Sequence, residues 1–192
     1  MAILSTPRAW LLPLTRRMIQ QRLDQPRFDL DCDLGSTPDG DGTGGPVSVH
    51  FPPEWPGDPL AFFPAILARL RPGQEEVQPD TSFTLVTRDP QPGGQLTAIG
   101  QLGTTGTVSV WGDLEIGYGL NPAAWNQGYA TEAVGVLVTH LHTLPRVRRV
   151  VAATALHNRA SERVLEKTGF TRTGQRWSAD DGDLTTWAHE RI

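Results

Sequence analysis

The order of strand-like and helix-like segments constrains the fold of this chain more than any other feature. The strand-like segment 113–120 is followed by helix, strand, helix, strand and strand patterns over 128–143, 148–154, 159–168, 170–177 and 185–190. A β-α-β unit of this kind lays parallel strands in one sheet with the helix on its face. Two earlier segments, 82–87 and 96–102, flank a Pro- and Gly-rich turn and indicate antiparallel strands. The pattern therefore predicts one mixed sheet with helices on its faces.

The first third of the chain is less regular. Residues 8–14 read as an edge strand, and Thr15 is placed to cap a short helix after it. A second helix is expected over 58–70, where apolar residues recur at helical spacing. Between them, 29–46 holds five glycines, and we expect a loop there within a flexible acidic, Gly- and Pro-rich insertion over 29–57.

Composition excludes several classes of protein. The 192 residues fit one domain, 1–192, and the net charge of -4 argues against nonspecific nucleic-acid binding. No run approaches the ~18 apolar residues of a membrane span, and the first residues make a poor signal peptide. Cys32 is the single cysteine, so neither an internal disulfide nor a thiolate metal cluster is expected. We expect a soluble protein of the cytoplasm.

Two patterns resemble metal sites, but each lacks a feature that metal binding requires. The segment 39–44 resembles the start of a calcium loop, but His50 stands where a bidentate glutamate is needed. His140 and His142 are two apart and so do not share a face of a helix. We therefore predict no metal site.

The helix expected over 128–143 has an apolar stripe, and its beginning is unusual. Gly128 and Ala130 are small, so the backbone amides around them are uncovered. A helix N-terminus with bare amides favours an anion, and a diphosphate suits it well. The alternative is a tight turn in which the glycine merely relieves a steric clash. Because no lysine follows as in the loops of nucleoside triphosphatases, ATP and GTP are disfavoured.

The next helix is sharply bounded. Asn158 can cap its N-terminus, and Gly169 stands where a left-handed residue ends a helix, followed by Phe170 for the hydrophobic contact. Ser161 falls in the first turn. Taken alone, Asn158 can be explained as a helix cap and Ser161 as an ordinary residue of the first helical turn.

Four blocks taken together resemble a known family. They are Glu115-Ile116-Gly117-Tyr118, the segment 125–133, Asn158-Arg159-Ala160-Ser161, and the segment 166–170. The chain resembles the GNAT superfamily of acetyl-coenzyme A-dependent N-acetyltransferases, and within it the Rim-type branch that includes ribosomal-protein N-terminal acetyltransferases. The opening Thr6-Pro7-Arg8 also fits that branch. The resemblance implies an α+β fold with a mostly antiparallel sheet of six to seven strands, splayed between the fourth and fifth, and about four helices.

The resemblance also assigns residues to acetyl-coenzyme A. The diphosphate would be held by the main-chain amides of Asn126, Gln127, Gly128, Tyr129, Ala130 and Thr131. The pantetheine arm would pair with the main chain of Tyr118, Gly119 and Leu120. Asn158 would bind the same arm, and Ser161 would lie beside the sulfur. Trp125 departs from the Gln or Arg common at that position, but the backbone contacts do not need the side chain.

The chemistry needs a base and a proton donor. An alkyl ammonium must lose its proton before it attacks the thioester, and the leaving thiolate gains from a nearby donor. Many relatives use a tyrosine as the donor, but Leu165 occupies that position, so the resemblance points to Ser161 instead. Glu115 is the best candidate for the base, with a structural glutamate as the alternative.

Other candidates for the base remain. Some relatives carry it on the strand before Asn158, where this chain has Ala153, and others carry a glutamate before the final strand. The residues nearest to that second position are Ser178, Asp180 and Asp181. His157, His189 and a water chain complete the alternatives.

The sequence indicates only the chemical class of the acetyl acceptor. The resemblance implies a primary amine, either a small molecule or a protein N-terminus such as that of a ribosomal protein, and it allows a homodimer. Segment 29–57 would line the acceptor side, where its carboxylates would favour a cationic amine. The competing hypothesis is a coenzyme A-binding module that has lost catalysis and acts as a sensor or partner. Direct nucleic-acid and membrane partners are not expected.

Overall fold

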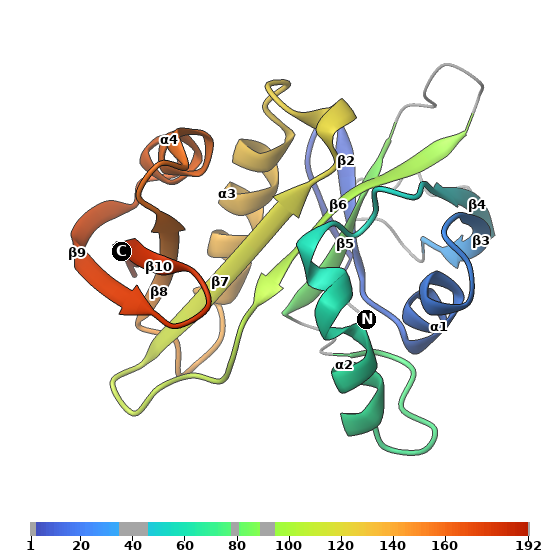
Figure 1. The fold of residues 1–192 in the computed structure, drawn as a ribbon, viewed down its shortest axis with the longest axis horizontal. Helices are drawn as coiled ribbons and strands as arrows, with labels where there is room; N and C mark the ends of the chain where they lie inside the picture. Colours follow the sequence, from blue (N-terminus) through green and yellow to red (C-terminus); the bar gives the residue numbers. More distant parts are fainter. Residues whose placement is uncertain (1–2, 35–45, 78–80, 89–94, 192) are drawn as a thin grey trace. The chain divides into compact units, whose positions relative to one another are not determined.

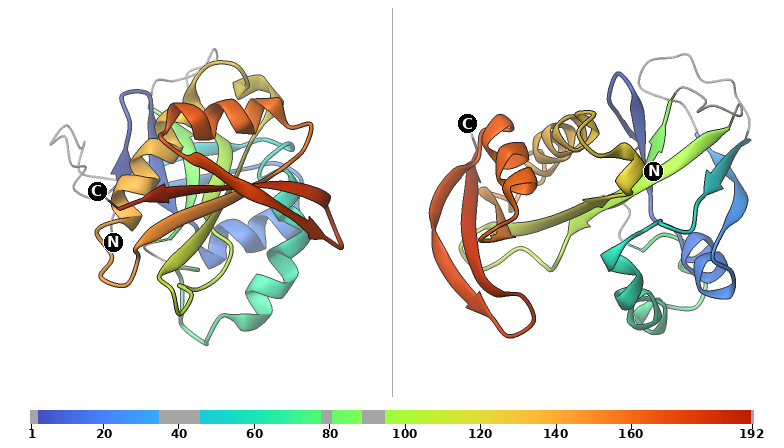
Figure 2. Two further views of the ribbon diagram at one scale, coloured as in Figure 1. Left: turned by 90° about the vertical axis from the view of Figure 1, so that its left-hand side faces the viewer. Right: turned by 45° about the horizontal axis from the view of Figure 1, so that its top comes forward.

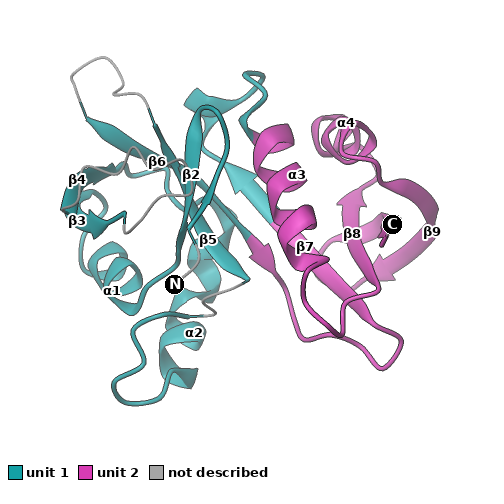
Figure 3. Ribbon diagram, turned by 180° about the vertical axis from the view of Figure 1, so that it is seen from behind, with its two compact units in different colours: residues 1–102, 118–129 teal, residues 103–117, 130–192 magenta. Residues whose placement is uncertain are grey.

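The computed structural model describes residues 3–34, 46–77, 81–88 and 95–191 of the chain (Figure 1). It divides into two compact units, Met1–Leu102 with Tyr118–Tyr129 and Gly103–Gly117 with Ala130–Ile192 (Figure 3). We call them unit 1 and unit 2 and describe each by itself. Two strands, β6 and β7, pass from one unit into the other along the chain.

Unit 1 is a sheet with two short helices. Its elements are β1 (Leu4–Ser5), β2 (Ala9–Pro13), α1 (Arg16–Asp24), β3 (Phe28–Asp33), β4 (Pro46–Phe51), the 3-10 helix η1 (Asp58–Phe62), α2 (Phe63–Arg69), β5 (Ser82–Thr87), most of β6 (Leu96–Thr104), the end of β7 (Asp113–Leu120) and the 3-10 helix η2 (Pro122–Ala124). The strand order is β1-β2-β5-β6, and β4 pairs parallel to β6 and antiparallel to β3.

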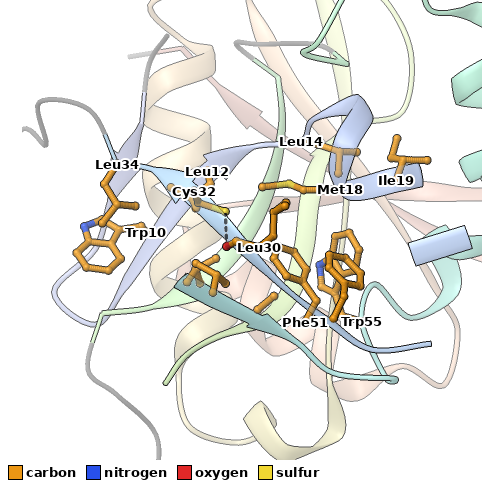
Figure 4. Packing of buried hydrophobic residues seen from close by; sticks show 14 of the residues in the cluster. Trp10, Leu12, Leu14, Met18, Ile19, Leu30, Cys32, Leu34, Phe51 and Trp55 are labelled. Atoms are coloured by element: carbon orange, nitrogen blue, oxygen red, sulfur yellow. Dashed lines mark hydrogen bonds between the residues drawn. The ribbon is translucent and has the colours of Figure 1, made fainter. Parts of the chain in front are cut away.

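An aromatic cluster forms the core of unit 1 (Figure 4). The ring of Phe28 stacks on that of Phe51 with centroids 4.6 Å apart, and Trp55 meets Phe51 edge-on at 4.8 Å. Phe63, at the start of α2, reaches the same tryptophan at 5.6 Å. Aromatic pairs in these geometries add to the stabilisation from apolar burial. These ring contacts pack β3, β4 and α2 against one another.

The loop expected from residue 29 is wrong at both of its ends. Residues Phe28–Asp33 form β3 with a strict alternation of buried and exposed positions, and Pro46–Phe51 form β4. The alternation Phe-Asp-Leu-Asp-Cys-Asp is itself a strand pattern, in which the apolar residues face the core and the aspartates face outward. Residues 35–45 lie outside the described part of the chain.

The second helix also differs from the expectation. The predicted 58–70 helix is divided into η1 and α2, with Pro64 near the start of the α-helical part. Proline lacks the N–H that would continue the ladder from the preceding turn, so the α-helix begins only at Phe63. The first helix is as predicted: Thr15 accepts a hydrogen bond from the amide of Met18 at 3.2 Å and caps α1.

Unit 2 contains the β-α-β unit. After the end of β6 and the first part of β7 come α3 (Tyr129–Leu141), β8 (Arg149–Ala155), α4 (Arg159–Lys167), β9 (Thr171–Ser178) and β10 (Gly182–Glu190). The order is β7-β8-β10-β9, with β7 and β8 parallel and the remaining pairs antiparallel. The two helices lie side by side (Figure 2), and a Cβ built at Gly135 of α3 would lie 3.9 Å from Thr168. The β7–β8 ladder ends at Ile116, which pairs with Ala152.

The predicted elements from residue 82 onward are confirmed within a few residues. The described residues form ten strands rather than six or seven, because β1, β3 and β4 add to the predicted set. Gly169 ends α4 at φ 87°, and the amide of Phe170 donates to the carbonyl of Leu165 at 3.0 Å, as the C-cap pattern predicts. Among the described residues, no helix has the length and apolarity needed to cross a membrane.

Candidate functional site

The end of β7 lies in unit 1 against β6, and Gly100 makes this close approach possible. A Cβ at Gly100 would lie 2.4 Å from the carbonyl oxygen of Gly119 and 3.0 Å from the Cα of Leu120, so a side chain has no room there. A Cβ at Gly119 itself would meet no heavy atom within 4 Å among the described residues. The face of the sheet at Gly119 is therefore open among the described residues, and the β7–β8 ladder ends before this point, at Ile116.

Side chains hold the chain after β7 in a fixed path. The buried Asn121 donates from its amide nitrogen to the carbonyl of Ala98 at 3.0 Å, and its backbone N–H donates to the carbonyl of Ile99 at 2.8 Å. The indole N–H of Trp125 donates to the carbonyl of Leu120 at 2.6 Å. This tryptophan therefore has a structural role, and it occupies one lone pair of a carbonyl that was predicted to face pantetheine.

The loop before α3 has two residues with positive φ. Asn126 has φ 58° and Gly128 has φ 88°, and α3 begins at the next residue, Tyr129. A glycine adopts this conformation without the steric cost that a Cβ would bring, and it has no side chain to cover the helix amides. The first four amides of a helix have no acceptor within the helix, and those of Ala130 and Thr131 belong to this first turn. The loop thus has the geometry of an anion site.

Asn158 and Ser161 are brought together in unit 2. The Asn158 side chain accepts a hydrogen bond from the backbone N–H of Ser161 at 3.0 Å and caps α4. Asn158 is exposed, while Ser161 is partly buried. Leu165, the position where many relatives carry a tyrosine, is fully buried and supplies no proton donor.

Glu115 faces a cavity of about 240 Å³ in unit 2, lined by Val151, Arg149, Thr173, Arg176 and Thr186 among others. It lies on the opposite side of β7 from the buried Leu114 and Ile116, as strand alternation requires. Both carboxylate oxygens accept from the guanidinium of Arg176, at 2.6 and 3.2 Å. Each oxygen keeps a second lone pair, so the carboxylate can still accept a proton. Neither Asn158 nor Ser161 lines this cavity.

A second ion pair borders the same cavity. Arg149 donates to both oxygens of Asp113, at 2.8 and 2.7 Å. The hydrogen bonds from Arg149 lower the pKa of Asp113, and the same bonds raise the pKa of Arg149. This pair fixes charge at the edge of the cavity, and it holds β8 to β7.

The alternative bases are placed in other settings. His189 forms a hydrogen bond to His142 at 3.0 Å and meets the ring of Phe170 edge-on, so its surroundings are those of a packed side chain. Burial, and then the neighbouring charges of His189 and Arg191, lower the pKa of His142. The segment 178–181 is a turn in which Ser178 accepts from the amides of Asp180 and Asp181.

Metal chemistry finds no support in the part of the chain that the structure describes. No group of three or more histidine, cysteine or acidic residues there could hold a metal ion. The segment 39–44, read above as a failed calcium loop, lies outside the described residues.

Sequence reasoning missed three functional neighbours. Arg176 was not linked to Glu115, because a pairing between β9 and β7 across the sheet leaves no local pattern. Gly100 was read only as part of a strand, although an isolated glycine in a strand signals close backbone approach. Arg8 was interpreted as the start of an edge strand and as part of the N-terminal resemblance, whereas its guanidinium contacts the loop before α3.

Comparisons with known proteins identify the family of the chain. The family model described as "Acetyltransferase (GNAT) domain" matches residues 45–171. A curated relative, the uncharacterized N-acetyltransferase YoaA of Bacillus subtilis (strain 168), is 35% identical over 60 residues, which are 31% of this chain and 34% of that protein. The match therefore spans about a third of this relative's length.

Solved structures share the fold at low identity. An acetyltransferase of the GNAT family from Bacillus anthracis has a TM-score of 0.59 at 17% identity, over 99% of both chains. RimL, described as a ribosomal L7/L12 alpha-N-protein acetyltransferase in complex with coenzyme A, has a TM-score of 0.59 at 16% identity, over 98% of both chains.

Proposed function

Because the chain belongs to the family of GNAT acetyltransferase domains, we propose that it transfers an acetyl group from acetyl-coenzyme A to a primary amine. The observation that carries the proposal is the loop before α3. Positive φ at Asn126 and Gly128 leads directly into the first turn of a 13-residue helix, whose first four amides have no acceptor within the helix. That geometry binds an anion such as a diphosphate, and this family uses it for coenzyme A.

The residues that the resemblance assigns to the coenzyme are taken unit by unit. In unit 1 the amides of 126–129 would hold the diphosphate, and the main chain of 118–120, which follows the end of the β7–β8 ladder at Ile116, would pair with the pantetheine arm as if the arm were one more strand. In unit 2 the amides of Ala130 and Thr131, in the first turn of α3, would hold the same diphosphate. Asn158 would bind the arm, and the hydroxyl of Ser161 would donate a hydrogen bond to the sulfur. Bound acetyl-coenzyme A supplies the activated acetyl group.

The chain's own residues manage the protons of the amine. Glu115 accepts the proton of the ammonium, directly or through water, so that the nitrogen gains a lone pair for attack. Arg176 holds the carboxylate in one orientation through its two hydrogen bonds. As the C–S bond breaks, the Ser161 hydroxyl donates a hydrogen bond to the departing thiolate and keeps its own proton. The parent thiol has an ordinary pKa of about 8.5, so the thiolate is a fair leaving group and the gain from this donor is modest.

The acceptor is proposed in two classes, a small-molecule amine and a protein N-terminus. The resemblance to the Rim-type branch supports a ribosomal-protein N-terminus as the first candidate. On the same resemblance we propose a cytoplasmic enzyme that forms a homodimer, which light scattering at two protein concentrations tests.

The experiment that distinguishes an active enzyme from an inactive sensor is a turnover assay. Release of free thiol from acetyl-coenzyme A is followed with a panel of small amines and N-terminal peptides of ribosomal proteins, and acetylated products are identified by mass spectrometry. We expect amine-dependent thiol release with matching acetylated product. Protection against heat by coenzyme A with no thiol release for any amine would instead favour an inactive sensor, a reading to which the buried Leu165 lends weight.

A further inference from the structure

Arg8 stands on a rigid N-terminal turn of unit 1. The hydroxyl of Thr6, which is buried, accepts hydrogen bonds from the amides of Arg8 and Ala9 at 3.2 and 2.9 Å. On the other side, the amide of Arg88 donates to the carbonyl of Arg8 at 2.9 Å. These bonds fix the backbone from which the arginine side chain extends at the start of β2.

The Arg8 side chain lies against the end of the loop before α3 and against Tyr129, the first residue of that helix. Its Nη2 donates to the carbonyl of Gln127 at 2.7 Å, and its guanidinium carbon lies 4.6 Å from the centroid of the Tyr129 ring. A Cβ built at Gly128 would lie 3.0 Å from the same Nη2. All of these residues belong to unit 1. Arg8 is 119 residues distant in sequence from the carbonyl that it binds.

The bond to Gln127 fixes the direction of a neighbouring donor. In a trans peptide the C=O and the following N–H point in opposite directions. When Arg8 draws the carbonyl of Gln127 toward itself, the N–H of Gly128 is therefore aimed away from Arg8. If the peptide plane turned over, a carbonyl oxygen would take the place of that donor and would repel a phosphate. Residues with positive φ on both sides, Asn126 and Gly128, leave the local backbone without a regular ladder to prevent this.

The positive charge of Arg8 also favours anion binding at this loop. A guanidinium remains protonated at all relevant pH values, and its contact with the tyrosine ring holds it at the loop. A fixed cation beside a loop of bare amides raises the local affinity for an anion.

We infer that Arg8 is a positioning residue for the coenzyme diphosphate, which it serves by holding the Gln127–Gly128 peptide with its N–H turned toward the anion. The inference rests on the proposed function and adds to it a residue outside the four sequence blocks. It gives a reason for an arginine at position 8, directly before β2, where the strand itself does not need one.

The test compares two ligands that differ in the diphosphate. Coenzyme A and pantetheine, which lacks the diphosphate and nucleotide, are titrated into the wild type, Arg8→Ala and Arg8→Lys, with amide NMR shifts to measure weak binding. We expect Arg8→Ala to lower the affinity for coenzyme A about tenfold, since it removes a charge-assisted hydrogen bond, and to leave pantetheine binding unchanged. Arg8→Lys should recover part of the loss because it keeps the charge without the planar fork.

A matched control is Arg16→Ala. Arg16 also donates to two backbone carbonyls in unit 1, those of Gln74 and Arg71, but it does not contact the loop. It should bind both ligands as the wild type does. If Arg8→Ala bound coenzyme A with unchanged affinity, or lost affinity for both ligands equally, the role in diphosphate binding would be refuted. If the wild type itself failed to bind coenzyme A, the proposed function would be refuted instead.

A second readout concerns the free protein. The amide resonance of Gly128 should be single and sharp in the wild type, and should shift or broaden in Arg8→Ala as the peptide plane is released. An unaltered Gly128 resonance in a folded Arg8→Ala variant would also overturn the inference.

Discussion

Replacing Glu115 by glutamine separates a chemical role from a structural one. Glutamine keeps the size of the side chain but cannot accept the proton of the amine. The ion pair that it breaks is partly open to solvent, with 30% of the Glu115 side chain and 49% of the Arg176 side chain exposed. Pairs this exposed contribute about 1 kcal/mol or less to stability. In a chain of this size that corresponds to a fall in Tm of about 2–4 °C.

The expected loss of rate is much larger than the loss of stability. A positioned general base contributes roughly 10²- to 10⁴-fold to the rate. We therefore expect Glu115→Gln to lower kcat/KM by about a hundredfold or more. The assay is thiol release at saturating acetyl-coenzyme A between pH 6 and 9, with Tm measured on the same samples.

Arg176→Gln is the matched control. It breaks the same ion pair at the same cost in Tm, but it leaves the carboxylate in place. Its rate should stay within about tenfold of the wild type, because loss of orientation is milder than loss of the base. If Glu115→Gln kept the wild-type rate and pH profile, or if Arg176→Gln lost as much rate, Glu115 would not be the base.

Four shorter predictions concern separate parts of the molecule. Gly128→Glu should abolish coenzyme A binding by calorimetry, because φ 88° strains any side chain and the charge repels phosphate, whereas Gly106→Glu, whose Cβ meets no described atom within 4 Å, should bind normally. Ser161→Ala should lower kcat by about a hundredfold or less with unchanged coenzyme affinity, and an unaltered rate would remove the donor role. Because the pKa of His142 is lowered in the folded protein, the unfolded chain binds a proton at this residue more readily, and the free energy of unfolding should decrease as the pH is lowered from about 6.5. His142→Gln should make the free energy of unfolding, measured by urea titration, depend less on pH in this range. An equal pH dependence in the wild type and the variant would contradict the assignment. Burial raises the pKa of Cys32 to about 12, so iodoacetamide should modify it at pH 8 only in denaturant; rapid modification of the folded protein would show that the thiol is accessible.

Local patterns predicted most of the second half of the chain. The apolar stripe of α3, the Asn158 cap and the Gly169 C-cap of α4 are each written in a few neighbouring residues, so they could be found without the structure. The β3 strand could also have been predicted, because its alternation of apolar residues and aspartates is regular. It was missed because the glycines that follow it dominated the interpretation of the segment.

The remaining features depend on contacts distant in sequence. Arg176 reaches Glu115 across 61 positions, and Arg8 reaches Gln127 across 119. Neither contact has a spacing rule, since each joins residues that only the folded chain brings together. The hydrogen bond from Trp125 to Leu120 is local, but its significance depends on which carbonyls a ligand needs. Site residues could thus be named from the sequence, whereas the side chains that orient them required the fold.

The most direct test of the central claim is the response of the loop amides to the coenzyme. In an amide NMR titration, coenzyme A should shift the resonances of residues 126–131 strongly, and pantetheine should shift them far less. If coenzyme A bound with those six resonances unmoved, the loop before α3 would not be the diphosphate site, and the account of acetyl transfer built on it would be contradicted.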